Sequence, residues 1–232
     1  MDNPSTQTKK MTLHYQILEE DIINWLKDYY YMHSLNAFVI GVSGGIDSAV
    51  VSTLCAKTDL RTYVLTMPLH SKEGNTKLSN QHASRLAAEY SNVIRLDVDL
   101  SETYDKFISN IDDTFTGNKV EDYGVGFFTK YGDGGVDIAP IADLYKSQVW
   151  ALGEHLGVNP EIIAATPTDG LWDDGRTDEG QIGASYKELE EAMEHRKGPA
   201  VDILDEFNRK NKHKMEPIPT FTLEKHYDNS RS

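Results

Sequence analysis

The chain has 232 residues, of which 39% are hydrophobic and 26% charged, a composition typical of a soluble globular protein. A net charge of −14 argues against non-specific nucleic-acid binding, which depends on Lys and Arg. No apolar run approaches the roughly 18 residues of a membrane span, the N-terminus lacks the apolar core of a leader peptide, and the single cysteine, Cys55, excludes an intrachain disulfide. We therefore expect a cytoplasmic protein without nucleic-acid or membrane partners.

The first half of the chain alternates helical and strand-like patterns. A loose tail over residues 1–11 precedes a helical spacing of apolar residues from 13 to about 30. Strands are predicted at 38–42, 62–67 and 92–98, with helices at 46–57 and 77–90. This alternation predicts an α/β fold: an open, doubly wound parallel sheet with helices on both faces. Ligands of such sheets bind at the carboxyl edge of the strands.

The second half is predicted to be mainly helical. Helices are expected at 120–128, 143–156, 185–196 and 200–211. Between them, residues 166–184 contain many Gly, Asp and Thr and few apolar residues. A loop of that length in a compact domain is usually functional, so we interpret it as a mobile lid.

The stretch FVIGVSGGIDSAV, residues 38–50, has the pattern of a strand, a tight turn and a helix. Ser43, Gly44 and Gly45 allow the backbone to approach an anion, and the helix that follows adds its positive end. Asp47 would repel a phosphate unless a cation lies between them, and Mg²⁺ satisfies that requirement. The alternative, a purely structural turn in which Asp47 favours the helix N-terminus, remains open from spacing alone.

Longer matches carry a family resemblance. SGGIDS, residues 43–48, resembles the signature of the PP-loop ATP pyrophosphatases, whose fold is of the adenine nucleotide alpha hydrolase type. Residues 116–150, residues 167–179 and the pair at 213–214 are similar to the NAD synthetase family, so the resemblance covers most of a single domain, residues 1–232. The block at 116–150 is the more specific of these matches, because several enzyme families share the PP-loop.

The resemblance implies a ligase that forms a C–N bond. In that family, the carboxylate of deamido-NAD attacks the α-phosphorus of ATP, pyrophosphate leaves, and ammonia attacks the acyl-adenylate to give NAD and AMP. No residues are left for a glutaminase domain, so ammonia would come from solution or from a separate donor. The family also implies a homodimer.

Carried over residue by residue, the resemblance assigns roles as follows. The ATP-binding residues would be Gly41, Val42, Ser43, Gly44, Gly45, Ile46, Asp47, Ser48, Thr116, Lys146 and Thr168. Asp47 and Glu121 would hold Mg²⁺, and Asp47 and Lys146 would be the catalytic pair. Deamido-NAD would contact Lys130, Asp137, His213 and Lys214. From spacing alone, Glu121 could equally be a solvated helix acid, Lys146 an exposed lysine, and His213–Lys214 part of a basic tail.

The sequence departs from the family between Phe115 and Thr116. The family has an arginine-rich helix and an apolar strand at this point, roughly 20–35 residues by ordinary element lengths. That helix supplies an arginine that contacts deamido-NAD and contributes to the dimer. Either the segment has been lost or the numbering closes over absent residues. We favour the second explanation, which predicts Cα atoms of Phe115 and Thr116 much farther apart than the ~3.8 Å of a trans peptide.

Two alternatives to an ammonia-dependent NAD synthetase follow from these observations. The chain could be another PP-loop ATP pyrophosphatase, such as the unit of a GMP synthetase, although FFTKYGDGG, residues 127–135, argues against this. It could also be an ATP-binding relative whose catalysis was impaired by the missing segment. The first alternative predicts turnover of xanthosine monophosphate, and the second predicts ATP binding without AMP formation.

Overall fold

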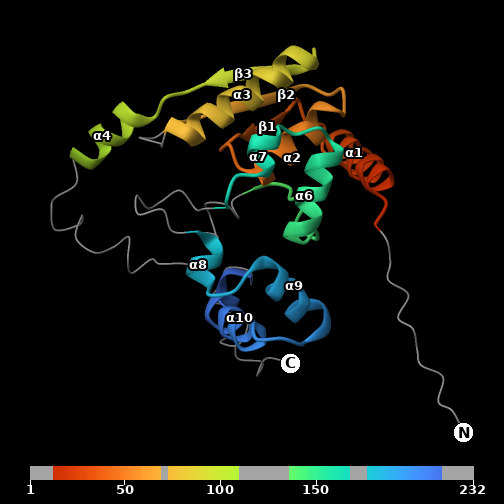
Figure 1. Ribbon diagram of the computed structural model, residues 1–232. Helices are drawn as coiled ribbons and strands as arrows, with labels where there is room; N and C mark the ends of the chain where they lie inside the picture. The colour runs from red at the N-terminus through yellow and green to blue at the C-terminus, as the bar shows by residue number, and fades with distance from the viewer. Residues whose placement is uncertain (1–12, 69–72, 110–135, 168–176, 216–232) are drawn as a thin grey trace, which may run out of the picture.

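Twelve helices and strands make up the part of the chain that the computed structural model describes, residues 13–68, 73–109, 136–167 and 177–215 (Figure 1). The strands are β1 (Phe38–Gly41), β2 (Thr62–Thr66) and β3 (Val93–Asp97). The helices are α1 (Tyr15–Met32), α2 (Ile46–Ala56), α3 (Glu73–Glu89), α4 (Ser101–Ser109), α6 (Lys146–His155), α7 (Pro160–Ile163), α8 (Asp178–Ile182), α9 (Tyr186–His195) and α10 (Val201–Met215).

The three strands form a parallel sheet in the order β1-β2-β3, which confirms the predicted parallel α/β architecture. Phe38 of β1 pairs with Thr62 of β2, and Thr62 pairs with Val93 of β3. The backbone N–H of Val42 donates to the carbonyl of Leu65 over 2.8 Å. This bond continues the pairing of β1 with β2 up to the first residue after the strand, and so fixes where the glycine turn begins.

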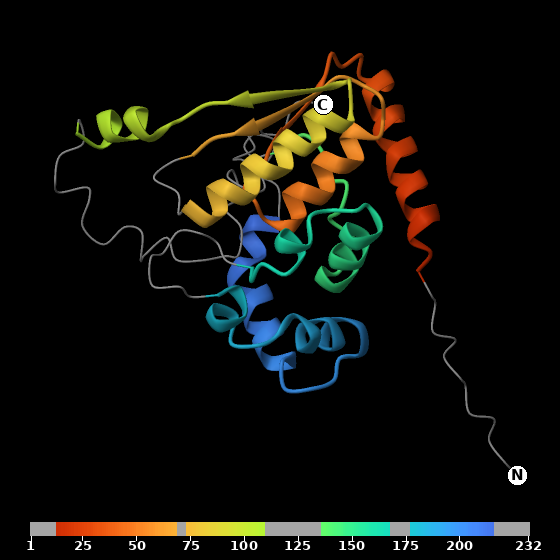
Figure 2. The same cartoon turned by 45° about the horizontal axis from the view of Figure 1, so that its top comes forward.

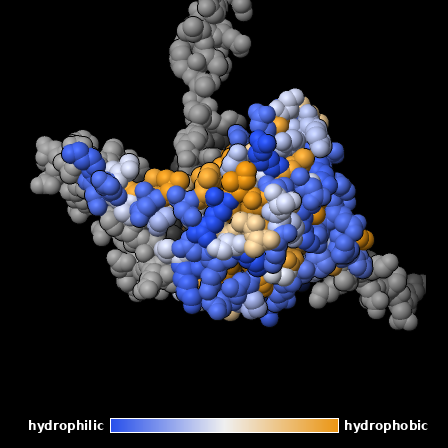
Figure 3. Space-filling view, turned by 90° about the horizontal axis from the view of Figure 1, so that it is seen from above, coloured by the Kyte–Doolittle hydropathy of each residue, from blue (hydrophilic) through white to orange (hydrophobic). Residues whose placement is uncertain are grey.

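One face of this sheet is covered by α2 and α3, which lie side by side against the strands (Figure 2). Phe38, Val64 and Val93 point to that face and are buried. On the other face, Val39 keeps 65% of its surface exposed, and Ile94 of β3 is also exposed. Figure 3, which views the molecule from above, shows apolar residues among hydrophilic ones on the upper surface. Among the described helices, α2 and α3 make the main contacts with the strands, and they do so on the first face.

Helix α6 belongs to the main apolar core and also contacts α9, which belongs to a separate apolar cluster. The main core joins α1, α2, α6 and α7 to β1, with Leu26, Val50 and Leu152 among its fully or almost fully buried members. A separate cluster holds α8, α9 and α10 together, and consists of Ala184, Leu189, Ala192, Ala200 and Leu204. Figure 1 shows α6 between the sheet and this group of three helices, which we call the C-terminal helical unit.

Several element boundaries differ from the sequence prediction. The helix predicted at 143–156 begins at Lys146, because residues 139–144 form turns in which the carbonyls of Ala139 and Ile141 accept from Ala142 and Leu144. The short helices α4 and α7 were not predicted, and α3 begins four residues earlier than expected.

The predicted lid at 166–184 contains the short helix α8. The hydroxyl of Thr177 caps this helix by accepting from the backbone N–H of Gly180. The remainder of the predicted lid, residues 168–176, and the helix predicted at 120–128 lie outside the described residues. Among the described residues, no helix combines the length and apolar content needed to cross a membrane.

Candidate active site

The glycine turn after β1 has the backbone geometry of an anion site. Gly44 has a φ of +91°, a conformation that glycine adopts without the steric cost of a Cβ. Gly45 precedes α2 in an extended conformation, so the first N–H groups of α2 lack helical partners. Among the described residues, no backbone carbonyl accepts from the N–H groups of Gly44 or Ile46. These donors and the positive end of α2 suit a phosphate.

Two serines fix the shape of this turn. The hydroxyl of Ser48 donates to the carbonyl of Gly45 over 3.0 Å and accepts from the backbone N–H of Ser43 over 3.2 Å. The hydroxyl of Ser43 accepts from the N–H of Gly45 over 3.3 Å and lies 3.2 Å from the hydroxyl of Ser48. The turn is therefore held in its open shape by its own side chains.

An ion pair crosses the turn. The Nζ of Lys146, the first residue of α6, lies 2.6 Å from Oδ2 of Asp47 in the first turn of α2. Lys146 keeps only 15% of its side chain exposed, whereas Asp47 keeps 54%. Lys146 is therefore mostly buried and paired, so its reading as an exposed surface lysine is wrong. A largely enclosed cation and an accessible carboxylate lie beside backbone donors, an arrangement suited to a polyphosphate and its metal ion.

The close packing of α6 on α2 brings these two residues together. A Cβ built at Gly153 of α6 would lie 2.8 Å from Cδ1 of Ile46 and 3.4 Å from Cγ2 of Val50. A larger residue at position 153 would therefore force the Ile46 side chain to shift. The glycine therefore allows the approach that places Lys146 next to Asp47, the residue after Ile46.

The aromatic ring of Tyr186 lies beside this ion pair. The Nζ of Lys146 is 5.7 Å from the centre of the Tyr186 ring, within the range of a cation–π contact. Trp150 meets the same ring edge to face, with centroids 5.8 Å apart and planes at 88°. The Tyr186 hydroxyl donates to Oδ2 of Asp178 over 3.0 Å. Burial, reinforced by the charge of Asp178, raises the pKa of the Tyr186 phenol far above its ordinary value, so the phenol stays protonated.

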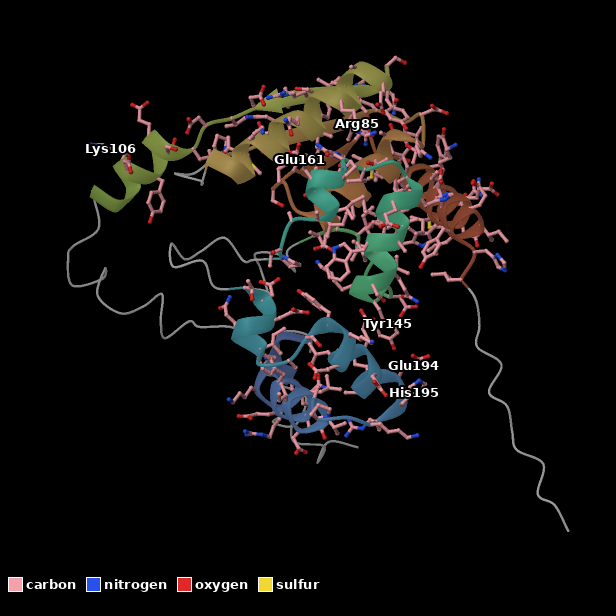
Figure 4. The ribbon with its side chains drawn as sticks, viewed as in Figure 1. Arg85, Lys106, Tyr145, Glu161, Glu194 and His195 are labelled. Carbon is pink, nitrogen blue, oxygen red and sulfur yellow. The ribbon has the colours of Figure 1, made fainter. Side chains whose placement is uncertain are left out.

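A carboxylate of α9 also holds the N-terminus of α6. Oε1 of Glu190 accepts from the backbone N–H of Ser147 over 2.9 Å, and Oε2 accepts from the Ser147 hydroxyl over 2.7 Å. At the residue before α6, the N–H of Tyr145 donates to Oε1 of Gln148 over 2.8 Å. Figure 4 shows Tyr145 at the end of α6 that faces α9.

A buried histidine supports α2 one turn behind the glycine turn. His82 of α3 is 1% exposed, and its Nε2 lies 3.0 Å from Oγ of Ser52. The Ser52 hydroxyl donates to the carbonyl of Ser48, so it accepts from the imidazole N–H. Burial first, and the charge of Arg85 second, lower the pKa of His82 to about 4, so the ring is neutral at pH 7. Figure 4 labels Arg85 on α3.

The structure brings together some predicted site residues and does not describe others. Residues 41–48 and Lys146 meet at the glycine turn. Asp137 is exposed in the segment before α6, while His213 and Lys214 belong to the last turn of α10, where only the backbone is described. Thr116, Glu121, Lys130, Thr168 and the junction of Phe115 with Thr116 lie outside the described residues.

The metal prediction is only partly covered by the described residues. Asp47 offers an accessible carboxylate next to the anion site, and carboxylate oxygens are the ligands that Mg²⁺ prefers. In the described ranges, no group of three or more His, Cys, Asp or Glu side chains is placed to hold a metal ion. The residue set present therefore fits an ion shared between Asp47 and phosphate oxygens.

Sequence reasoning missed the contribution of α9. Tyr186 and Glu190 follow one another by four residues and so lie on the same face of this helix. Their pattern predicts an amphipathic helix, but nothing in it predicts which helix the face contacts. Only the fold shows that it contacts Lys146, Ser147 and Trp150.

Comparison with known proteins identifies relatives along nearly the whole chain. The family model described as NAD synthase matches residues 18–118 and residues 114–227. The NH₃-dependent NAD⁺ synthetase of Carboxydothermus hydrogenoformans is 30% identical over 241 residues, covering 88% of this chain and 96% of the relative. The enzyme of the same name from Sulfolobus acidocaldarius is 34% identical over 222 residues, covering 82% of this chain and 77% of the relative.

Solved structures give a consistent picture of the fold. The NMN synthetase of Francisella tularensis superposes with a TM-score of 0.77 at 27% identity, covering 91% of this chain and all of that one. The NH₃-dependent NAD synthetase of Campylobacter jejuni has a TM-score of 0.65 at 22% identity, covering 90% of this chain and all of that one. At that identity, the second likeness shows the fold alone.

The comparisons also show that a relative has residues that this chain lacks. The alignment with the Carboxydothermus protein runs over 241 residues, more than the 232 of this chain, so that relative has residues without a counterpart here. The two matched segments of the family model meet at residues 114–118, where the sequence departs from the family pattern. The spacing of Phe115 and Thr116 lies outside the described residues, and the predicted break between them stays a prediction.

Proposed function

Because the chain belongs to the NAD synthase family, a family of ligases that form a C–N bond, we propose that it amidates a nicotinate nucleotide with ammonia at the expense of ATP. The preferred substrate is deamido-NAD, and the products are NAD, AMP and pyrophosphate. The observation that carries the proposal is the Asp47–Lys146 pair, which spans the glycine turn from two helices 99 residues apart in sequence.

The residues at the turn match the chemistry that this reaction requires. A carboxylate is a poor acceptor for ammonia, so it must first be activated as an acyl-adenylate, which releases pyrophosphate. Negative charge then accumulates on the leaving group, where prearranged donors contribute most to rate. The N–H groups of Gly44 and Ile46, which donate to no backbone carbonyl of the described residues, bind polyphosphate oxygens, and the ammonium of Lys146 balances the departing charge. Lys146 already lies beside the turn, paired with Asp47, so little reorganisation is needed.

Mg²⁺ is the metal ion that we propose for this site. It would supply charge neutralisation between the carboxylate and the phosphate oxygens. Asp47 would hold it, together with Glu121, for which the resemblance implies the same role. A homodimer and a cytoplasmic location complete the proposal; both rest on the family resemblance rather than on described contacts.

A second candidate substrate follows from the structural comparison. The NMN synthetase of Francisella tularensis superposes with a higher TM-score than the Campylobacter NAD synthetase, 0.77 against 0.65. For this chain, the corresponding reaction would be amidation of nicotinate mononucleotide, the acid form of NMN. The same phosphate turn and lysine would serve it, because both substrates present an identical nicotinate carboxylate to ATP.

The test is a substrate comparison with purified protein, ATP, Mg²⁺ and ammonium chloride. Deamido-NAD, nicotinate mononucleotide and xanthosine monophosphate are supplied separately, and AMP and the amidated product are measured by mass spectrometry. A kcat/KM highest for deamido-NAD supports the main proposal, and one highest for nicotinate mononucleotide supports the second candidate. AMP formed only with xanthosine monophosphate, or with none of the three, refutes both. At fixed total ammonium the rate should rise with pH, and glutamine should not replace ammonium.

A further inference from the structure

The C-terminal helical unit contacts the candidate active site through one face of α9. Glu190 binds both the backbone and the side chain of Ser147, which fixes the end of α6 against α9. One helical turn earlier on α9, Tyr186 lies against Lys146 and Trp150. The face of α9 that carries Tyr186 and Glu190 therefore packs against the first turn of α6, which contains Lys146.

We propose that Tyr186 is a positioning residue that holds the ammonium of Lys146 over the phosphate turn, an inference that rests on the proposed function of Lys146. The Nζ of Lys146 has two described neighbours, a charged one and an aromatic one. Oδ2 of Asp47 lies at 2.6 Å, and the centre of the Tyr186 ring lies at 5.7 Å. When a polyphosphate and its metal ion engage Asp47, the ring remains to hold the ammonium in place. A lysine side chain without such support would spread over several rotamers.

The surroundings of Tyr186 suit this role. Its hydroxyl is anchored to Asp178, its backbone N–H donates to Oε1 of Glu179 over 2.8 Å, and Trp150 supports the ring from the side. The ring therefore has contacts in three directions and cannot follow a moving lysine. Its phenol stays protonated and thus cannot act as a base at neutral pH. What the residue offers to Lys146 is the face of an aromatic ring.

Two substitutions separate the ring from the hydroxyl. Tyr186→Phe keeps the ring and removes the bond to Asp178, whereas Tyr186→Leu removes the ring. A cation–π contact is worth about 0.5–2 kcal/mol, which corresponds to about a 2- to 30-fold effect. We expect kcat to fall by about that factor in Tyr186→Leu, with KM for the nicotinate substrate changed by less, and kcat to stay near wild type in Tyr186→Phe. Tyr31→Leu, at an exposed tyrosine of α1, is the matched control.

A double-mutant cycle distinguishes positioning from a general structural effect. If Tyr186 acts through Lys146, Tyr186→Leu should lower kcat in the wild-type background and have no further effect in a Lys146→Met background. An equal loss in both backgrounds would overturn the proposal. So would a Tyr186→Phe variant as slow as Tyr186→Leu, because the hydroxyl rather than the ring would then be the part that matters.

A substrate-free measurement keeps the inference independent of the proposed activity. The ε-methylene protons of Lys146, assigned by their absence in Lys146→Met, should show an upfield ring-current shift in NMR spectra of the wild type and of Tyr186→Phe. That shift should disappear in Tyr186→Leu, while urea unfolding confirms that the variant is folded. If no nicotinate substrate is turned over but the shift behaves as expected, the proposed function fails and the contact stands. If the shift is absent in the wild type, Tyr186 does not hold Lys146.

Discussion

Replacing Lys146 with Met should lower the activity strongly while leaving the stability of the fold almost unchanged. The substitution keeps the aliphatic stem and removes the charge. The partner carboxylate of Asp47 is 54% exposed, so water solvates it once the lysine is gone. The free energy of unfolding should therefore change by no more than about 1 kcal/mol, the usual value of an ion pair with an exposed member. By analogy with the loss of one donor from an oxyanion site, kcat should fall by roughly 10²–10³, equivalent to about 2.7–4 kcal/mol.

Lys57→Met is the matched control, because it should behave in the opposite way. Lys57, the residue that follows α2, pairs with Glu19 of α1, whose side chain is only 10% exposed. His155 of α6 also bonds Glu19 over 2.8 Å, so the carboxylate would keep one of its two partners. We expect the unfolding free energy to fall by about 1–3 kcal/mol, with turnover per folded molecule unchanged.

Urea unfolding followed by circular dichroism measures the first quantity, and AMP release under saturating substrates measures the second. A Lys146→Met variant that loses stability and activity in proportion would refute the reasoning, because the lysine would then serve the fold. A change confined to KM would mean that Lys146 contributes only uniform binding.

Three further predictions test the surroundings of the site. Asp47→Asn is nearly isosteric, so it should keep the fold and lose most turnover through the missing carboxylate charge; unchanged kcat at saturating Mg²⁺ would contradict the assignment. His82 is neutral when folded, with a pKa lowered by burial from 6.5 to about 4, and the unfolded chain takes up its proton below about pH 6.5. The free energy of unfolding is therefore independent of this group above about pH 6.5 and falls as pH is lowered towards 4, by up to about 3 kcal/mol. Urea unfolding at pH 7 and at pH 5 should show a lower stability at pH 5, and the difference should be smaller in His82→Gln. Gly153→Ala should destabilise the protein by about 1–2 kcal/mol through its contact with Ile46, and a normal melting temperature would argue against that tight packing.

The strands and the glycine turn could be predicted because their signals are local. Phe38–Val42 is a short apolar run followed by glycines, and such runs with turn residues between helical patterns indicate a parallel sheet. The beginning of α6 could not be predicted well. Residues 143–145 continue a helical pattern, but the chain makes turns there and the helix begins at Lys146.

The contacts of the site depend on tertiary packing and so escaped local reasoning. Asp47 and Lys146 are 99 residues apart, and only the family resemblance pointed to both. Tyr186 lies on a helix whose pattern predicts that it packs but not what it packs against. Its contact with Lys146 depends on how α9 packs against α6. Helical periodicity indicates which face is buried and contains no information about the partner.

The C-terminal helical unit has an apolar cluster of its own, separate from the core beneath the sheet, and meets the lysine-bearing end of α6 through Tyr186 and Glu190. Parts with separate cores can open at different free energies. Heat or ageing could then detach the unit while the sheet and its helices remain folded. Catalytic competence would decay at a lower temperature than the far-ultraviolet dichroism signal. The fraction of active molecules in a preparation would then be lower than the folded fraction given by circular dichroism. Titration of active sites would measure the active fraction directly.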